Sequence, residues 1–205
     1  MIVDSKEEIQ SMYEFLDKEG YEFNECNPFG IRDYSGIEKG VYNDTIGLLC
    51  ENEMYLFKGT TDPSPYYIEK KPMNANGTAV MCSGLQHKIW MVGSHARRCI
   101  GLINGWRGRH GTKRQTVKRL DKKYRFKKKI YRGWFACNLH PAFDNNFSYI
   151  GRNSAGCQVI ANEKEFQQYM GYIMISDEYK ANKHTLYSYY LFEEGSIARR
   201  IAEML

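Results

Sequence analysis

The sequence has no long apolar run. No stretch of its 205 residues approaches the roughly 20 consecutive apolar residues that a membrane-crossing helix needs. The first five residues, Met1-Ile2-Val3-Asp4-Ser5, also lack the basic and apolar regions of a secretory signal. We therefore expect synthesis in the cytosol without a signal peptide. Another route would then deliver the protein to the periplasm or cell wall, or incorporate it in a virion.

The sequence also lacks metal-binding and redox patterns. Its six cysteines are widely separated and form no C-x-x-C pair, and no two of its five histidines have metal-ligand spacing. We therefore predict no metal and no cofactor. Apart from Cys157, the cysteines are expected to be reduced, buried and apolar in character, as free cysteine usually is.

One segment, residues 107–132, almost lacks acidic residues. It contains 13 Lys or Arg and a single acid, Asp121, although the whole chain carries only +5. Such a segment attracts polyanions or an acidic protein surface, and the aromatic residues in it could stack on exposed bases. The alternative is a solvated hairpin whose basic side chains alternate outward, with Val117, Leu120, Tyr124 and Phe126 facing inward.

The remaining pattern predicts a mainly β domain with flanking helices (α+β). Hydrophobic residues make up 42% of the chain, and no repeat or linker divides it, so one domain spans 1–205. A helix is expected at 5–18, where Ser5 and Glu8 would form a capping box and Gly20 would end the helix. A second is expected at 163–175, with Phe166, Met170, Ile173 and Met174 on one face. A third is expected at 196–205. Short apolar segments bounded by turn residues predict strands at 45–50, 53–58, 78–82, 88–92, 98–103, 132–140 and 187–192. Residues 1–40 would be a helix and lead-in, about 40–175 the core, and 176–205 a terminal strand and helix.

The sharpest local motif is Asn153-Ser154-Ala155-Gly156-Cys157-Gln158-Val159-Ile160. Small residues before the cysteine permit a tight turn, whose amide groups could face an oxyanion. Ser154 could hydrogen-bond an imidazole or a substrate. Cys157 is therefore a candidate nucleophile, and the alternative is a packed core cysteine.

His140 is the best partner for this thiol. It ends an apolar strand 17 residues before Cys157, and a hairpin return would bring the two side chains together. A cysteine is nucleophilic as its thiolate, and a neighbouring imidazolium lowers the thiol pKa from about 8.5. His110 lies within the basic segment, 47 residues before the cysteine, and is rejected as the catalytic histidine.

His140 followed by Ser154-Ala155-Gly156-Cys157 resembles the signature of the L,D-transpeptidases: a histidine, a spacer of about this length, then S-x-G-C. Together with Tyr42-Asn43-Asp44 and Gly59-Thr60-Thr61-Asp62-Pro63, it is similar to small phage-encoded proteins of that type. The resemblance implies a β-sandwich or barrel whose cysteine attacks peptidoglycan stem peptides.

By this resemblance, Cys157 would be the nucleophile, His140 the general base and then acid, and the amides around Gly156 the oxyanion hole. Asn138, Arg152, Asn153 and His95 would line the substrate site, although His95 is also a candidate structural histidine. The chain departs from the family at Val159, where an arginine is usual, and at Pro141, where a glycine is common.

Two functions follow. The first is a cysteine-dependent hydrolase or transpeptidase acting on peptidoglycan. The second is an inactive virion or polyanion-binding protein that retains the fold.

Overall fold

Strands dominate the computed structural model, which describes residues 1–3, 5–104, 110–144 and 147–193. This confirms the mainly β, α+β class that the sequence predicts. The strands are β1 (Ile2–Val3), β2 (Cys26–Arg32), β3 (Asp44–Cys50), β4 (Glu53–Thr60), β5 (Thr78–Met81), β6 (Gly84–His95), β7 (Cys99–Ile103), β8 (Gln115–Leu120), β9 (Tyr131–Gly133), β10 (Leu139–Pro141), β11 (Gln158–Ile160) and β12 (Tyr187–Glu193). The helices are α1 (Lys6–Lys18), α2 (Glu163–Ile175) and α3 (Asp177–Ala181), with a π-helical turn at Tyr66–Lys70.

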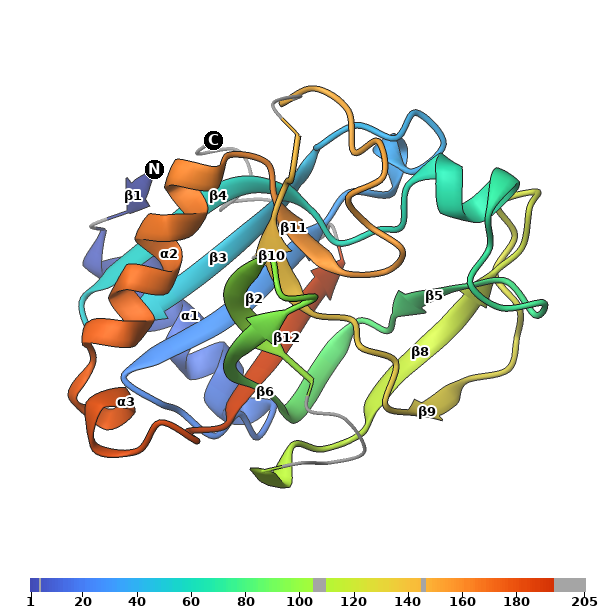
Figure 1. Ribbon diagram of the computed structural model, residues 1–205. Coiled ribbons are helices and arrows are strands. Elements are labelled where there is room, and N and C mark those ends of the chain that lie inside the picture. Colours follow the sequence, from blue (N-terminus) through green and yellow to red (C-terminus); the bar gives the residue numbers. More distant parts are fainter. Residues whose placement is uncertain (4, 105–109, 145–146, 194–205) are drawn as a thin grey trace.

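Eight of the described strands close into a barrel (Figure 1). Their order is β4-β11-β10-β7-β6-β12-β2-β3, and β3 pairs with β4 again to complete the ring. Strand β1 adds to the free side of β4, and β5, β8 and β9 form a separate three-stranded sheet. The barrel includes β2 and β12, which lie outside the range 40–175, so both ends of the chain contribute to it.

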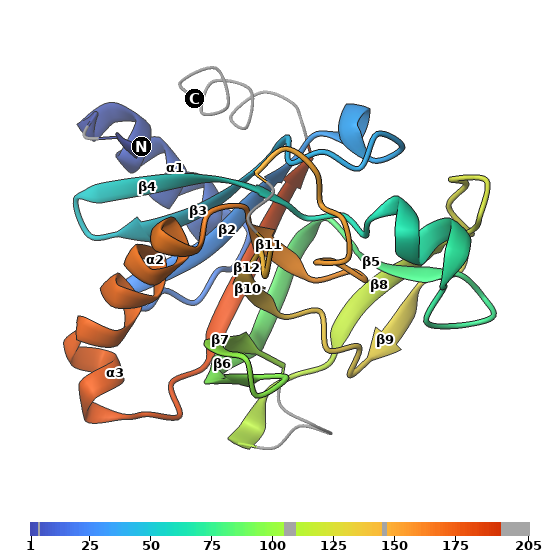
Figure 2. The same ribbon diagram turned by 45° about the horizontal axis from the view of Figure 1, so that its top comes forward.

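Successive side chains on a strand point to opposite faces, so the barrel has an inner and an outer set. Tyr55 and Phe57 of β4 pack inward with residues of α2, whereas Met54 and Leu56 pack outward against α1. Figures 1 and 2 accordingly show α1 and α2 on opposite sides of β3 and β4. The two helices thus cover the two faces of the same strands.

The helices at 5–18 and 163–175 are confirmed as α1 and α2. The expected capping box is wrong, because the Ser5 side chain makes no capping hydrogen bond. Met174 does not belong to the buried face of α2, since it is 41% exposed, and Tyr169 takes its place there. The helix expected at 196–205 lies outside the described residues. No helix in the described part of the chain combines the length and the apolar character required to cross a membrane.

The continuous strand expected at 132–140 is wrong. Residues 131–133 belong to β9 and residues 139–141 to β10, and these strands lie in different sheets. Between them Ala136 adopts a φ of 54°, which a strand does not allow. Strand β2 went unpredicted because Asn27, Pro28 and Gly30 interrupt its apolar pattern, although all its residues are buried.

Cys26 and Cys50 form a disulfide, which corrects the expectation that they are reduced. The register of β2 and β3 places these two residues opposite each other. Sequence spacing alone does not reveal which strands pair, and the pairing is what brings the sulfurs together. Cys82, Cys99, Cys137 and Cys157 are free.

Candidate functional site: a thiol and two imidazoles on the outer face of the barrel strands

Strands β10 and β11 carry the candidate catalytic residues side by side. They pair in parallel, with His140 opposite Val159, and the Gln158 N–H donates to the Asn138 carbonyl at 2.8 Å. The expected antiparallel hairpin return is therefore wrong. Instead, the chain returns from the end of β10 to the start of β11, and the described residues of this connection are 142–144 and 147–157.

Cys157 and His140 lie on the same outer face of this strand pair. Leu139 and Ile160 point into the inner core, whereas Val159 and Cys157 pack in an outer cluster with Tyr42. Strand alternation then places His140 outward as well. Strand spacing and rise per residue put the Cα atoms of Cys157 and His140 roughly 8 Å apart, a distance that two side chains can span.

His140 is buried and held as a neutral imidazole. It is 1% exposed, and its Nδ1–H donates to the Pro141 carbonyl at 2.8 Å. Its ring stacks on those of His95 and Phe143, with centroids 4.1 and 4.9 Å away. Burial, and then the nearby His95 and Arg98, lower the pKa of His140 to about 3. With the proton on Nδ1, the unprotonated Nε2 has a lone pair and is available as a base.

The Asn138 side chain hydrogen-bonds the His95 ring and not the His140 ring. The Asn138 side-chain N–H donates to His95 Nδ1 at 2.9 Å, and its oxygen accepts from the Asn104 N–H at 2.9 Å. Since His95 Nδ1 is an acceptor here, the neutral ring carries its proton on Nε2. Burial and Arg98 lower the pKa of His95. His95 thus belongs to the constellation, and the Pro141 carbonyl is what orients His140.

The Cys157 thiol is half-buried and donates to the Ala136 carbonyl at 3.5 Å. Burial raises its pKa to about 11, although the Asn138 backbone N–H opposes the shift. The sequence-based expectation that an imidazolium lowers this pKa is therefore wrong for the free protein. Thiol and imidazole are both neutral near pH 7, and each donates its hydrogen to a different carbonyl.

The polar groups of the turn before Cys157 hydrogen-bond one another. The Ser154 hydroxyl donates to the Cys157 carbonyl at 2.8 Å and accepts from the Gly156 N–H at 3.2 Å. Ser154 therefore positions the turn and does not contact the imidazole, and the Gly156 N–H is already engaged. Gly156 itself is required, because its φ is 118° and a Cβ would lie 2.4 Å from the Ala79 carbonyl oxygen.

Arg152 and Asn153, both expected to bind substrate, have other partners. Asn153 is buried; its oxygen accepts from the Phe143 N–H at 2.8 Å, and its amide donates to the Tyr42 hydroxyl and to Asp144. It joins the two ends of the connection between β10 and β11. The Arg152 guanidinium lies 4.6 Å from the ring centroid of Tyr66 and remains exposed.

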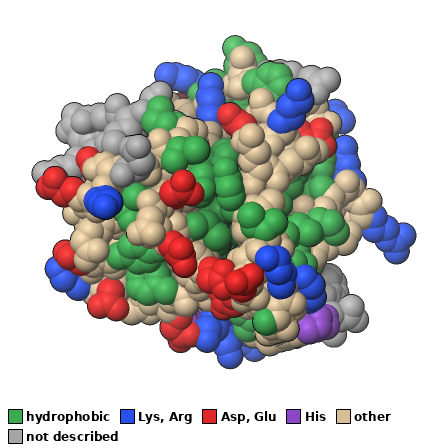
Figure 3. All heavy atoms as spheres, turned by 90° about the vertical axis from the view of Figure 1, so that its left-hand side faces the viewer, with side chains coloured by type: hydrophobic (Ala, Val, Ile, Leu, Met, Phe, Trp, Pro, Cys, Tyr) green, Lys and Arg blue, Asp and Glu red, His purple; other side chains and the backbone are tan. Residues whose placement is uncertain are grey.

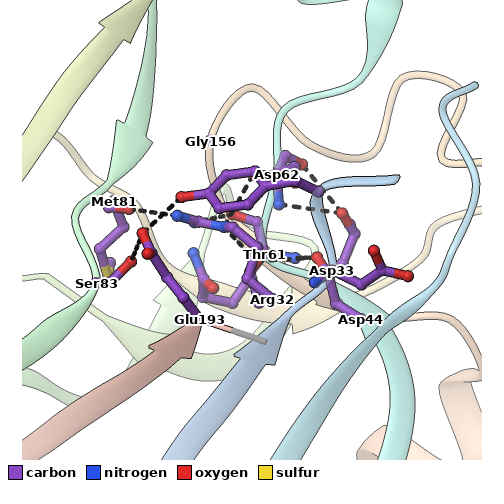
Figure 4. Close-up of polar contacts among 12 residues, drawn as sticks. Arg32, Asp33, Asp44, Thr61, Asp62, Met81, Ser83, Gly156 and Glu193 are labelled. Atoms are coloured by element: carbon purple, nitrogen blue, oxygen red, sulfur yellow. Dashed lines mark hydrogen bonds and ion pairs between the residues drawn. The ribbon is translucent and has the colours of Figure 1, made fainter. Parts of the chain in front are cut away.

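A buried ion-pair network lies next to the turn at residues 153–157 that precedes and includes Cys157 (Figure 4). Arg32 Nε lies 3.0 Å from Asp62, and the guanidinium also donates to Thr61 and to the Met81 carbonyl. Asp44 accepts from the N–H and hydroxyl of Thr61, at 2.6 and 2.9 Å. Burial, and then Asp62, raise the pKa of Asp44 to about 7. The Ser64 N–H beyond this network donates to the Ser154 carbonyl at 2.9 Å, so segments 42–44 and 59–63 both support this turn.

Two residues of the constellation were not found from sequence. The Arg98 guanidinium lies over the Phe143 ring, 3.9 Å from its centroid, and Phe143 in turn stacks on His140. Phe143 also borders a cavity of about 290 Å³, together with Ala142, Asp144, Phe147, Asn162, Glu163 and Lys164. No motif in the sequence marks either residue, because Arg98 lies in the turn between β6 and β7 and Phe143 follows β10, and only the fold brings them to His140.

The basic segment lies elsewhere, in the three-stranded sheet. Val117 and Leu120 of β8 are buried, as expected for the inner face of a hairpin, whereas Phe126 is 40% exposed. Arg119 is also buried against the rings of Tyr131 and Phe135, so the basic residues do not all alternate outward. Residues 107–109 lie outside the described residues.

Comparison of the chain with family models, with curated proteins and with solved structures finds no match.

Proposed function

We propose that the protein is a cysteine-dependent peptidoglycan enzyme, a stem-peptide hydrolase or transpeptidase of the L,D-transpeptidase-like type. The observation that carries this proposal is the common outer face of β10 and β11, which holds Cys157 and His140, with the His140 Nδ1–H donated to the Pro141 carbonyl. That hydrogen bond leaves Nε2 unprotonated, as a general base requires.

In the proposed reaction, His140 Nε2 removes the thiol proton as Cys157 Sγ attacks a stem-peptide carbonyl. The carbon–nitrogen bond breaks, the imidazolium protonates the leaving amine, and a thioester on Cys157 remains. Water then regenerates the thiol by hydrolysis, or a second amine takes the acyl group. Because the Gly156 N–H is bonded to Ser154, the Cys157 N–H would stabilise the oxyanion.

The neutral resting pair implies that substrate binding activates the thiol. The sulfur must leave the Ala136 carbonyl and turn toward the imidazole, a rotation about the Cα–Cβ bond. Exclusion of water by the bound peptide would then favour a concerted proton transfer over a preformed ion pair.

The departures from the family bear on the outcome of the reaction. Val159 is fully buried in the outer cluster, so no guanidinium is available at that position to bind a substrate carboxylate. Pro141 belongs to β10 and pairs with Ile160. Both hydrolysis and cross-linking therefore have to be assayed.

The decisive experiment is digestion of purified peptidoglycan, with products identified by mass spectrometry. The wild type is expected to form new products, and Cys157→Ala to form none. Cys82→Ala is a matched control, because Cys82 is another half-buried free thiol and lies beside β8, with its N–H donated to the Thr116 carbonyl, rather than beside His140. Identical product profiles for the wild type and Cys157→Ala would exclude the enzyme.

The disulfide supports a location outside the cytosol. Disulfides form and persist in oxidising compartments and are rare in the reducing cytosol. The Cys26–Cys50 bond is thus consistent with delivery to the periplasm or cell wall, or with incorporation in a virion.

The second candidate is an inactive virion or polyanion-binding protein, and the raised thiol pKa and buried imidazole favour it. It predicts binding to DNA or another polyanion that weakens steeply with salt, as counterion release requires. Binding of this kind, equal in wild type and Cys157→Ala and without any peptidoglycan product, would support it.

A further inference from the structure

A groove with acidic walls lies beside the disulfide, away from the cysteine–histidine site. It has a volume of about 620 Å³ and is lined by Glu25, Cys26, Cys50, Glu51, Asn52, Glu53, Tyr55, Tyr172, Ile175 and Ser176. Three of these residues are carboxylates and none is basic. We call this the acidic groove.

The acidic groove combines charge with exposed apolar surface. Glu51 and Glu53 are exposed at the turn between β3 and β4, and Ile175 at the end of α2 is 63% exposed. Tyr55 and Tyr172 stack at 3.9 Å within it. Figure 3 looks onto this side of the molecule, where acidic side chains gather around hydrophobic ones. A complementary partner must offer cationic and apolar side chains together.

The chain itself carries such a surface at residues 121–130, which we call the basic hairpin. Lys127, Lys128, Lys129 and Ile130 are consecutive and exposed, and Ile130 is 57% exposed. The Lys127 N–H donates to the Arg119 carbonyl at 2.8 Å, and a β-bridge joins Phe126 to Leu120. The hairpin is therefore ordered before any partner binds, which limits the entropy lost on association.

The two surfaces lie at opposite ends of the molecule. In Figure 1 the turn between β3 and β4 and the end of α2 are on the left, whereas the chain between β8 and β9 projects at the right. They cannot meet within one chain. We propose that the acidic groove binds the basic hairpin of a second copy, so that copies associate head to tail.

Such a contact is heterologous, because it uses two different patches. Each copy keeps one unused patch, so the association continues into open chains unless the rotation closes a ring. Screening shortens from about 10 Å at 0.1 M salt to about 3 Å at 1 M, so the association should weaken as salt rises. This inference is independent of the proposed enzyme, since neither patch includes Cys157 or His140.

The test is a charge exchange followed by sedimentation velocity. The hairpin variant is Lys127→Glu, Lys128→Glu and Lys129→Glu, and the groove variant is Glu51→Lys and Glu53→Lys. All five residues are exposed, so both variants are expected to fold. The wild type should associate in a concentration- and salt-dependent manner. Each variant alone should associate more than about a hundredfold more weakly, because like charges then face each other.

Mixing the two variants restores opposite charges at every contact, so the mixture should associate again. Misfolding of either variant could not produce this recovery. A wild type that stays monomeric at low salt, or a mixture that stays monomeric, would overturn the proposal. So would a hairpin variant that loses affinity for heparin while its self-association is unchanged, since the hairpin would then serve a polyanion.

Discussion

The imidazole of His140 stacks on that of His95, with ring centroids 4.1 Å apart and planes inclined by 16°. His95 lies at the end of β6 and His140 on β10, and β7 lies between these strands in the barrel order. Two stacked imidazoles in a buried site cannot both carry a proton without strong repulsion. The pair therefore explains part of the low pKa of His140.

Replacing His95 with Gln should raise the pKa of His140 from about 3, because the charge that His95 carries in acid is removed. Burial remains the larger cause, so the new value should stay below the ordinary 6.5. A pH titration of the imidazole carbons by NMR measures it. Arg98→Gln is the matched control, since Arg98 contributes a smaller shift of the same sign. An unchanged pKa in His95→Gln would refute the coupling.

Replacing His140 with Phe should make the protein less sensitive to mild acid. In the wild type the unfolded chain binds a proton below pH 6.5, whereas the folded His140 does so only near pH 3. Stability therefore falls as the pH falls through this window. Within this window, the difference in the free energy of unfolding between wild type and variant should change by roughly 1.4 kcal/mol per pH unit. Urea unfolding at several pH values measures this difference. Titration of the carboxylates affects both chains alike, so its contribution to the difference largely cancels. A difference independent of pH would contradict the burial argument.

Most of the secondary structure was predictable from local pattern, and most of the pairing was not. The period of Ile9, Met12 and Leu16 predicts α1, and short apolar segments predict β3 and β4. No local signal shows that β2 and β12 pair in parallel inside the barrel. Barrel closure depends on contacts between residues far apart in sequence, of which the Cys26–Cys50 disulfide is one consequence.

The sequence predicts which residues form the candidate site, but not their protonation. Spacing and small residues identified Cys157 and His140, and the topology places both on one face. Their protonation depends on burial and on His95, Arg98 and Phe143, which only the fold brings near. The sequence therefore indicated a charged pair where the structure has a neutral one.

Replacing Thr61 with Val should destabilise the protein by about 2–3 kcal/mol. The Thr61 hydroxyl accepts from Arg32 Nε at 2.8 Å and donates to Asp44 at 2.9 Å, in a buried site. Val keeps the shape but leaves a buried guanidinium and a carboxylate short of a partner. Thr61→Ser keeps the hydroxyl and should cost only about 1 kcal/mol for the lost methyl. Equal losses in the two variants, measured by urea unfolding, would show that the hydroxyl contributes nothing.

Reduction of the Cys26–Cys50 disulfide should lower the free energy of unfolding by about 3 kcal/mol. The bond closes a loop spanning 24 residues in sequence, so its loss restores freedom to the unfolded chain. Thermal unfolding with and without a reductant measures the effect. The double variant Cys26→Ser, Cys50→Ser should match the reduced wild type and show no response to reductant. A wild type whose thermal unfolding is also unaffected by reductant would contradict this prediction.

Alkylation of Cys157 by iodoacetamide should be slow at pH 7 and accelerate about tenfold per pH unit up to about pH 10. The reason is that only the thiolate reacts, and burial raises the thiol pKa to about 11. Peptide mass mapping separates this thiol from Cys82 and Cys99, whose pKa values burial also raises. His140→Phe should show the same pH profile, because a neutral imidazole does not stabilise the thiolate of the free protein. A rate that is already constant below pH 8 in the wild type, and falls in His140→Phe, would instead establish a thiolate–imidazolium pair.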